Sequence, residues 1–75
     1  MAVHRFGMKL LQLRRAKGWT LATLAGKLDY RSRGYLSEVE SGKKQPSVDL
    51  VVGVSRLFGV PTDELLKDEL EIGAG

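Results

Sequence analysis

Side chains that could perform catalysis or hold a metal ion are scarce in this 75-residue sequence. His4 is the only histidine and lies beside the N-terminus, and there is no cysteine. We find no cluster of acidic residues and histidine with the spacing of a metal site, and no glycine-rich loop suited to phosphate. Without a nucleophile and base pair, we expect a protein that is not an enzyme, with no metal, cofactor or evident small-molecule ligand.

The abundant reactive groups are instead basic, and they are unevenly distributed. Residues 1–56 contain eleven Lys and Arg against four Asp and Glu, a net charge of +7. Residues 57–75 contain one Lys against five Asp and Glu, a net charge of −4. A basic body with an acidic end indicates a polyanionic partner that meets one face of the molecule.

Size and composition limit the possible organisation. A chain of this length, with 43% hydrophobic and 28% charged residues, predicts a single packed domain over residues 1–75. No apolar run approaches the roughly 18 to 20 residues that span a bilayer, and the N-terminus lacks the apolar stretch of a signal peptide. We therefore expect a cytoplasmic protein that does not engage a membrane.

Helix caps, glycines and prolines divide the chain into short helical segments. No stretch alternates with period 2 over strand length, so we predict an all-α protein. Helices are predicted at residues 3–17, 20–28, 32–41, 47–58 and 62–70, with Thr20, Ser32 and Thr62 among the N-caps. In the fourth helix the residues expected to face the core are Val48, Val51, Val54 and Phe58. The second and third helices, with Ala25 permitting close approach, match helix-turn-helix geometry.

The order and spacing of many residues between Phe6 and Leu66 resemble those of a known family. They are Phe6-Gly7, Leu10, Leu13-Arg14, Gly18-Trp19-Thr20, Leu24-Ala25, Ser32-Arg33, Tyr35-Leu36-Ser37, Val39-Glu40, Gly42, Pro46-Ser47, Gly59-Val60 and Glu64-Leu65-Leu66. This pattern is similar to that of the lambda-repressor and Cro class, also called the xenobiotic-response-element family. The resemblance implies a compact five-helix domain whose second and third helices form a helix-turn-helix that binds double-stranded DNA.

The resemblance also implies roles for individual residues. In this family the first exposed positions of the third helix enter the major groove, which implies base contacts from Arg33, Gly34, Ser37 and Glu38. An arginine fork suits guanine O6 and N7, and a carboxylate can accept from cytosine N4. Phosphate contacts are expected from Thr20, Thr23, Ser32, Tyr35, Ser41, Lys43 and Lys44, although the lysines could simply be solvated. Arg14 and Glu40 resemble a structural ion pair of the family, and Trp19 is assigned to the core.

The turn between the second and third helices departs from the family pattern. Asp29-Tyr30-Arg31 stands where the family usually has two residues, often Gly-Val. The third helix could therefore be rotated, or Tyr30 could fill the apolar position while Arg31 projects toward DNA as an alternative base reader. Leu21 also replaces a glutamine that often holds a phosphate.

A domain of this size reads few base pairs by itself, so we expect a homodimer on a palindromic operator that regulates transcription, with repression as the favoured outcome. The predicted dimer interface consists of Leu50, Gly53, Leu57, Leu66, Leu70 and Ile72, some of which could instead complete the core. An alternative is an antitoxin-type interaction module whose acidic C-terminal part binds a toxin, while its helix-turn-helix represses its own operon.

Overall fold

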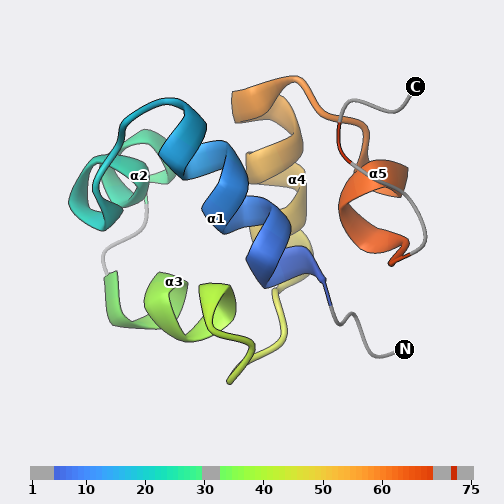
Figure 1. The fold of residues 1–75 in the computed structure, drawn as a ribbon, viewed down its shortest axis with the longest axis horizontal. Coiled ribbons are helices and arrows are strands. Elements are labelled where there is room, and N and C mark those ends of the chain that lie inside the picture. Colours follow the sequence, from blue (N-terminus) through green and yellow to red (C-terminus); the bar gives the residue numbers. More distant parts are fainter. Residues whose placement is uncertain (1–4, 30–32, 69–71, 73–75) are drawn as a thin grey trace.

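Five helices make up the fold in a computed structural model that describes residues 5–29, 33–68 and 72. They are α1 (Phe6–Ala16), α2 (Leu21–Leu28), α3 (Arg33–Glu40), α4 (Val48–Phe58) and α5 (Thr62–Leu66), and this part of the chain contains no strand (Figure 1). The predicted all-α, five-helix architecture is therefore confirmed. The helices are shorter than predicted, most clearly α1, which begins at Phe6, and α5, which ends at Leu66.

Local hydrogen bonds explain where several helices begin and end. Thr20 Oγ1 accepts from the N–H of Thr23, and Ser47 Oγ accepts from the N–H of Leu50, both at 3.1 Å, so these side chains cap α2 and α4. Thr62 was predicted to cap α5, and this prediction is wrong. Pro61 occupies the N-cap position, and Thr62 is the first helical residue. The predicted cap Ser32 lies outside the described residues.

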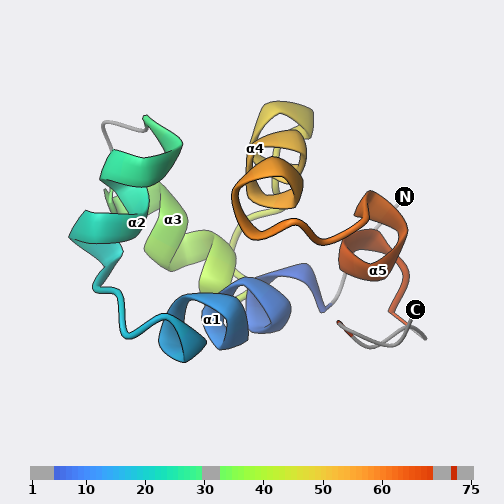
Figure 2. The ribbon, with the colours of Figure 1, turned by 90° about the horizontal axis from the view of Figure 1, so that it is seen from above.

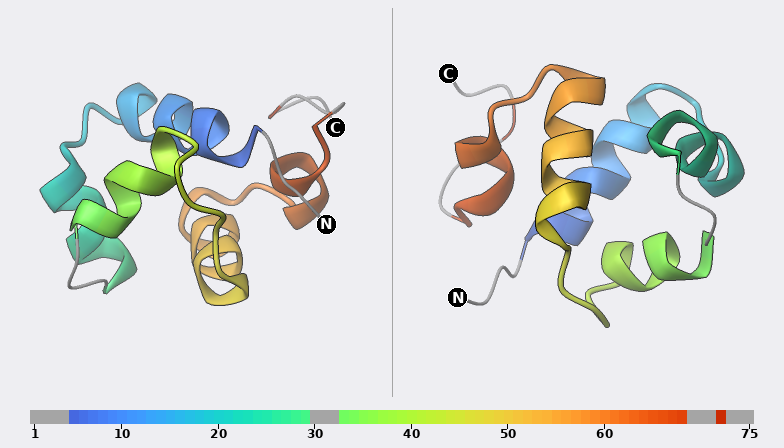
Figure 3. Two further views of the ribbon diagram at one scale, coloured as in Figure 1. Left: turned by 90° about the horizontal axis from the view of Figure 1, so that it is seen from below. Right: turned by 180° about the vertical axis from the view of Figure 1, so that it is seen from behind.

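The helices are arranged around α1 and α4. Helix α1 packs against α3 and α5, α2 packs against α3 and α4, and α4 packs against α5. Figures 1 and 2 show α2 and α3 together on one side of α4 and α5 on the other, and both views of Figure 3 agree. The helix-turn-helix pair and the acidic C-terminal helix therefore occupy opposite ends of the molecule.

The core draws on all five helices. Its buried apolar residues are Phe6, Leu10, Leu24, Ala25, Leu36, Val39, Leu50, Val51, Val54 and Leu65. Val48 was predicted to join them, but 79% of it is exposed, whereas Leu50 is fully buried. Positions 48 and 50 lie about 200° apart around a helix, so only one of them can face the core. Leu50 faces it here, and Val48 is left at the surface.

Asp29 ends α2 in a left-handed conformation, with φ 58° and ψ 38°, and no other described non-glycine residue has a positive φ. A side chain at such a position costs free energy that glycine avoids. We expect Asp29→Gly to raise the free energy of unfolding by about 0.5 kcal/mol. Asp29→Ala keeps a Cβ but loses the polar group, so we expect it to lower the free energy of unfolding by about the same amount. Urea denaturation followed by circular dichroism measures both, and a less stable glycine variant would contradict this explanation of the turn.

Candidate nucleic-acid interface

Helix α3 presents a polar outer face opposite its buried side. Leu36 and Val39 point into the core, while Arg33, Gly34 and Ser37 are exposed. Arg33 and Ser37 are four residues apart and therefore lie on the same face of the helix, one turn from each other. The structure thus brings three of the predicted base-contact positions together on one accessible surface. Arg31 lies outside the described residues.

Glu38 is the remaining predicted base-contact residue, and it lies at the edge of this surface. Its carboxylate Oε1 is 3.9 Å from Lys44 Nζ, with about half of each side chain exposed. The lysine therefore offsets part of the repulsion that a carboxylate would meet beside a phosphate backbone. The distance and exposure make this a weak pair that leaves both groups accessible.

The N-terminus of α2, a helix that packs against α3, presents two further predicted contact residues. Thr20 and Thr23 are both exposed, and their hydroxyl oxygens are 3.1 Å apart. The threonine cap occupies the N–H of Thr23, and a helix N-terminus attracts anions through its partial positive charge. Thr20 and Thr23, both predicted to contact phosphates, therefore lie at the end of α2 whose partial positive charge attracts an anion.

The loop from Ser41 to Ser47 presents Lys43 and Lys44 and is held by the end of α3. The N–H groups of both lysines donate to the carbonyl of Glu38, at 2.8 and 3.2 Å, and Ser41 Oγ donates to the same carbonyl at 3.1 Å. This shared acceptor keeps the lysine backbone close to α3, while the side chains of both lysines remain exposed.

Tyr35 secures the other end of this loop, a role that the sequence did not reveal. Its hydroxyl donates to the carbonyl of Gln45 at 3.3 Å and accepts from the N–H of Ser47 at 3.0 Å. The Tyr35 hydroxyl thus bonds to the loop, and the Ser41 hydroxyl bonds to the end of α3. These bonds determine where the lysines stand relative to α3. The predicted phosphate contacts of Tyr35 and Ser41 stay a prediction.

Arg14 and Glu40 form the predicted ion pair and connect α1 to the end of α3. Arg14 Nε donates to Glu40 Oε2 at 2.8 Å, and a second guanidinium nitrogen donates to Oε1 at 3.1 Å. The third guanidinium nitrogen donates to the carbonyl of Trp19 at 2.8 Å. The side chains are 15% and 7% exposed. One guanidinium thus joins α1, the segment before α2, and α3.

Trp19 packs as predicted against the protein interior. Its ring centroid is 5.5 Å from that of Phe58, at a tilted angle of 40°. Lys27 Nζ lies 5.3 Å from the same ring, a distance suited to a cation–π contact. The indole therefore connects the segment before α2 to the end of α4 through its contact with Phe58.

One residue of the predicted dimer interface lies inside the monomer. Leu50 is fully buried, so the prediction is wrong for it. Gly53 is partly buried, and a Cβ added to it would lie 3.3 Å from Leu28 Cδ2 of α2, so its place in an interface stays a prediction. Leu57, Leu66 and Ile72 are partly buried against the core, and Leu70 lies outside the described residues.

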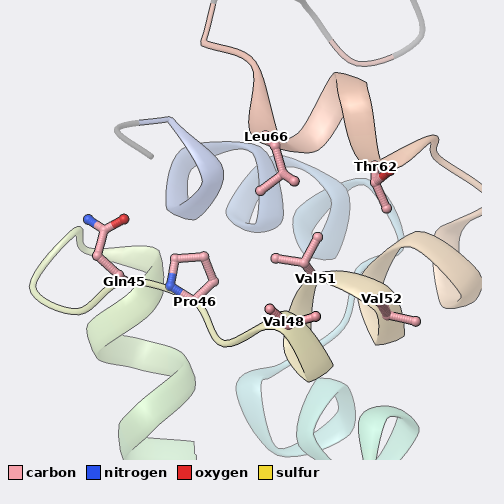
Figure 4. Close-up of a pocket in the computed structure, with 7 residues that line it drawn as sticks. All are labelled: Gln45, Pro46, Val48, Val51, Val52, Thr62 and Leu66. Carbon is pink, nitrogen blue, oxygen red and sulfur yellow. The ribbon is translucent and has the colours of Figure 1, made fainter. Parts of the chain in front are cut away.

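An apolar groove between α4 and α5 lies beside the predicted interface. It has a volume of about 360 Å³ and is lined by Gln45, Pro46, Val48, Val51, Val52, Thr62 and Leu66 (Figure 4). Figure 4 shows the valines projecting from α4 and Leu66 from α5, with Pro46 closing one end. The accessible apolar surface of α4 is therefore formed by its valines, and of the predicted interface residues that the structure describes only Leu66 lines the groove.

No helix within the described ranges has the length and apolar character to cross a membrane. Among these same residues, no three His, Cys, Asp or Glu side chains gather where they could hold a metal ion.

The capped helix α2, which is terminated by Asp29, and the outward-facing helix α3 packed against it define a helix-turn-helix protein. The sequence matches the family model described as "Helix-turn-helix domain" over residues 5–67. The chain belongs to this family.

Two proteins with similar sequences carry names that describe them as regulators of transcription. The HTH-type transcriptional activator BcrR of Enterococcus faecalis is 44% identical over 64 residues, covering 85% of this chain and 31% of the activator. The SPbeta prophage-derived uncharacterized HTH-type transcriptional regulator YonR of Bacillus subtilis (strain 168) is 36% identical over 62 residues, covering 83% of this chain and 56% of the regulator. The chain thus spans only part of the length of either relative.

Two solved structures share both fold and sequence with the chain. The N-terminal DNA binding domain of SinR from Bacillus subtilis superposes with a TM-score of 0.79 at 32% identity, covering 91% of this chain and 99% of that domain. The restriction-modification controller protein C.AhdI from Aeromonas hydrophila superposes with a TM-score of 0.71 at 31% identity, covering 83% and 92%. These matches support the predicted likeness to the lambda-repressor class.

Proposed function

We propose that this chain binds a specific double-stranded DNA sequence through α3 and regulates transcription. The observation that supports this most strongly is the exposed polar face of α3, on a helix that packs against α2 and is followed by the loop of Lys43 and Lys44. The Arg14 and Glu40 pair and the Tyr35 hydrogen bonds hold these three parts in a defined arrangement. Groups arranged before binding lose less conformational entropy when they meet a ligand.

Within this surface the roles divide by chemistry. Arg33, on the first turn of α3, is the proposed base reader, because a guanidinium fork can donate two hydrogen bonds to guanine. Ser37 and Glu38 lie about one turn further along, and we propose that they contact neighbouring bases. Lys43 and Lys44, together with the threonines of α2, are proposed to bind phosphates and to set the register of the domain on the duplex.

The second part of the proposal is that two copies bind a palindromic operator as a homodimer. Half-sites of helix-turn-helix dimers lie about 34 Å apart, and the longest dimension of this domain is 29 Å. Two copies can therefore lie side by side, one on each half-site. The simplest output is repression, since an occupied operator excludes other proteins.

The groove between α4 and α5 is the proposed contact surface for the second copy. Two of its lining residues, Gln45 and Pro46, directly follow Lys44 in the lysine loop, so a copy docked there would stand beside the same stretch of DNA. The exposed neighbours of the lining residues have charges of both signs, namely Lys44, Asp49, Asp63 and Lys67. In a two-fold contact, a residue away from the axis in one copy faces a different residue of the other copy, and the reverse contact also forms. A rim with charges of both signs can therefore place a lysine of each copy opposite an aspartate of the other.

The base-reading role of Arg33 is tested by comparing two kinds of substitution on an operator selected from random DNA. We expect Arg33→Ala to lose about 1 to 3 kcal/mol on the selected site and to relax the requirement at one base pair. Lys43→Ala and Lys44→Ala should instead weaken binding to every duplex and make the salt dependence shallower by about one unit each. Fluorescence anisotropy at two salt concentrations, against the operator and a one-base variant, separates the two effects.

Arg31→Ala is the control for the longer turn. If Arg33→Ala weakens both duplexes equally while Arg31→Ala abolishes the difference between them, Arg31 is the base reader. If no substitution distinguishes the operator from the variant duplex, the proposed specific recognition is wrong.

A further inference from the structure

We propose that Lys9, buried in α1, is a positioning residue that holds α5 in place and so completes the groove on which a second copy docks. The link to docking rests on the proposed homodimer, whereas the link to α5 rests on the contacts of Lys9 alone.

Lys9 is the only lysine in the described ranges that is buried, with none of its surface exposed. Its Nζ donates to the carbonyl of Glu64 and, at 2.8 Å, to that of Lys67. Removing an ammonium group from water is costly unless hydrogen bonds replace its hydration. Here the replacement comes from two backbone carbonyls more than 50 residues away along the chain. The Lys9 side chain therefore reaches from α1 across the α1–α5 contact to the backbone of α5 and of Lys67.

Helix α5 has little to hold it in place by itself. It contains five residues, and no side chain caps its N-terminus. A helix this short is unstable in isolation, and the last carbonyls of any helix lack partners within it. The Lys9 ammonium occupies the C-terminal end of α5, where the helix dipole favours a cation. Lys9 of α1 therefore supplies the hydrogen-bond donor for carbonyls at the C-terminal end of α5.

A second tie from α1 reinforces the first. The backbone N–H of Arg5 donates to Asp68 Oδ1 at 3.0 Å, and its guanidinium donates to the carbonyl of Asp68. Arg5 and Lys9 are four residues apart and therefore lie on one face at the start of α1. Together they bind the carbonyls of Glu64, Lys67 and Asp68.

The groove connects this clamp to the proposed dimer. Thr62 and Leu66 of α5 form one side of the groove, and three valines of α4 form the other (Figure 4). Leu65, on the same short helix, is fully buried in the core. If α5 loses its tie to Lys9, Leu66 should move away from α4, while Arg14 still holds α3 at the other end of α1. Loss of Lys9 should therefore weaken dimerisation and leave the DNA-contacting helices in place.

Lys9→Met is the informative substitution, because methionine keeps the apolar stem and removes only the ammonium. Lys17→Met is the matched control, since it removes the same charge from an exposed position at the end of α1. Three measurements are needed on the purified full chain: amide hydrogen exchange of residues 62–67, the dimer dissociation constant by sedimentation equilibrium, and affinity for DNA containing one half-site.

We expect Lys9→Met to speed exchange in α5 and to weaken dimerisation, each at least tenfold relative to Lys17→Met. Half-site affinity should fall no further than in the control, so only the full operator should lose cooperative binding. A merely structural role would lower half-site affinity together with dimerisation. Exchange and dimerisation equal to those of Lys17→Met would overturn the proposal.

Two further outcomes are distinguishable. If Lys9→Met does not fold, Arg5→Met keeps Lys9 and removes the neighbouring guanidinium bond to the Asp68 carbonyl. It should weaken dimerisation by a smaller factor, and no change there would overturn the proposal. If the wild type is monomeric and binds its operator as a monomer, the homodimer is wrong, and so is the docking part of this inference. The exchange of α5 in Lys9→Met then decides whether Lys9 positions this helix.

Discussion

Gly7→Ala is expected to destabilise the protein by about 3 kcal/mol or more, a large share of the stability of a small domain. A Cβ at this position would lie 2.0 Å from the carbonyl oxygen of Val39 and 2.9 Å from that of Glu40. Both obstacles are backbone atoms at the end of α3, so no side-chain rotation can relieve the overlap. Helices α1 and α3 would have to separate, which opens the core around Phe6 and Leu10.

Gly26→Ala is the matched control for this prediction. Gly26 also lies within a helix, but an added Cβ there meets no atom within 4 Å. Alanine should therefore stabilise α2 by about 0.5 to 1 kcal/mol through its higher helix propensity. Urea denaturation of both variants measures the difference. If Gly7→Ala were as stable as the wild type, the close approach of α1 to α3 could not be as described.

Removing either member of the Arg14 and Glu40 pair is the second change expected to have a large effect. Each single replacement by methionine should cost about 3 kcal/mol, because the remaining charge is left largely buried without its partner. Loss of Arg14 also removes a donor from the carbonyl of Trp19. Replacing both residues together should cost less than the two single losses added, since no lone charge then remains.

The exposed pair of Lys44 and Glu38 is the comparison for this double-mutant cycle. Its atoms are 3.9 Å apart and its side chains are 56% and 43% exposed, so its coupling should be below about 0.5 kcal/mol. Additive losses for Arg14 and Glu40 would show that the pair does not stabilise the fold. The Arg14 and Glu40 variants should also weaken DNA binding on all sequences, because α3 loses one of its ties to α1.

Local features of the sequence were sufficient to predict the helices and the face of α3. Thr20 and Ser47 cap their helices through bonds to residues three positions away, so short-range chemistry determines where α2 and α4 begin. The alternation of Leu36 and Val39 with Arg33 and Ser37 follows the helical repeat and separates buried from exposed sides. The Arg14 and Glu40 pair was predicted from the family resemblance, not from any local signal.

Only the tertiary structure decided which faces of α4 and α5 meet the core. Apolar residues surround much of α4, so periodicity was a poor guide: it favoured Val48 for the core, whereas packing against the other helices buried Leu50. No local signal indicated that Leu28 of α2 lies against Gly53. The burial of Lys9 had no local signal either, because its acceptors lie on a helix more than 50 residues away. Helix caps and exposed faces depend on neighbours along the chain, whereas burial depends on which segments distant in sequence pack together.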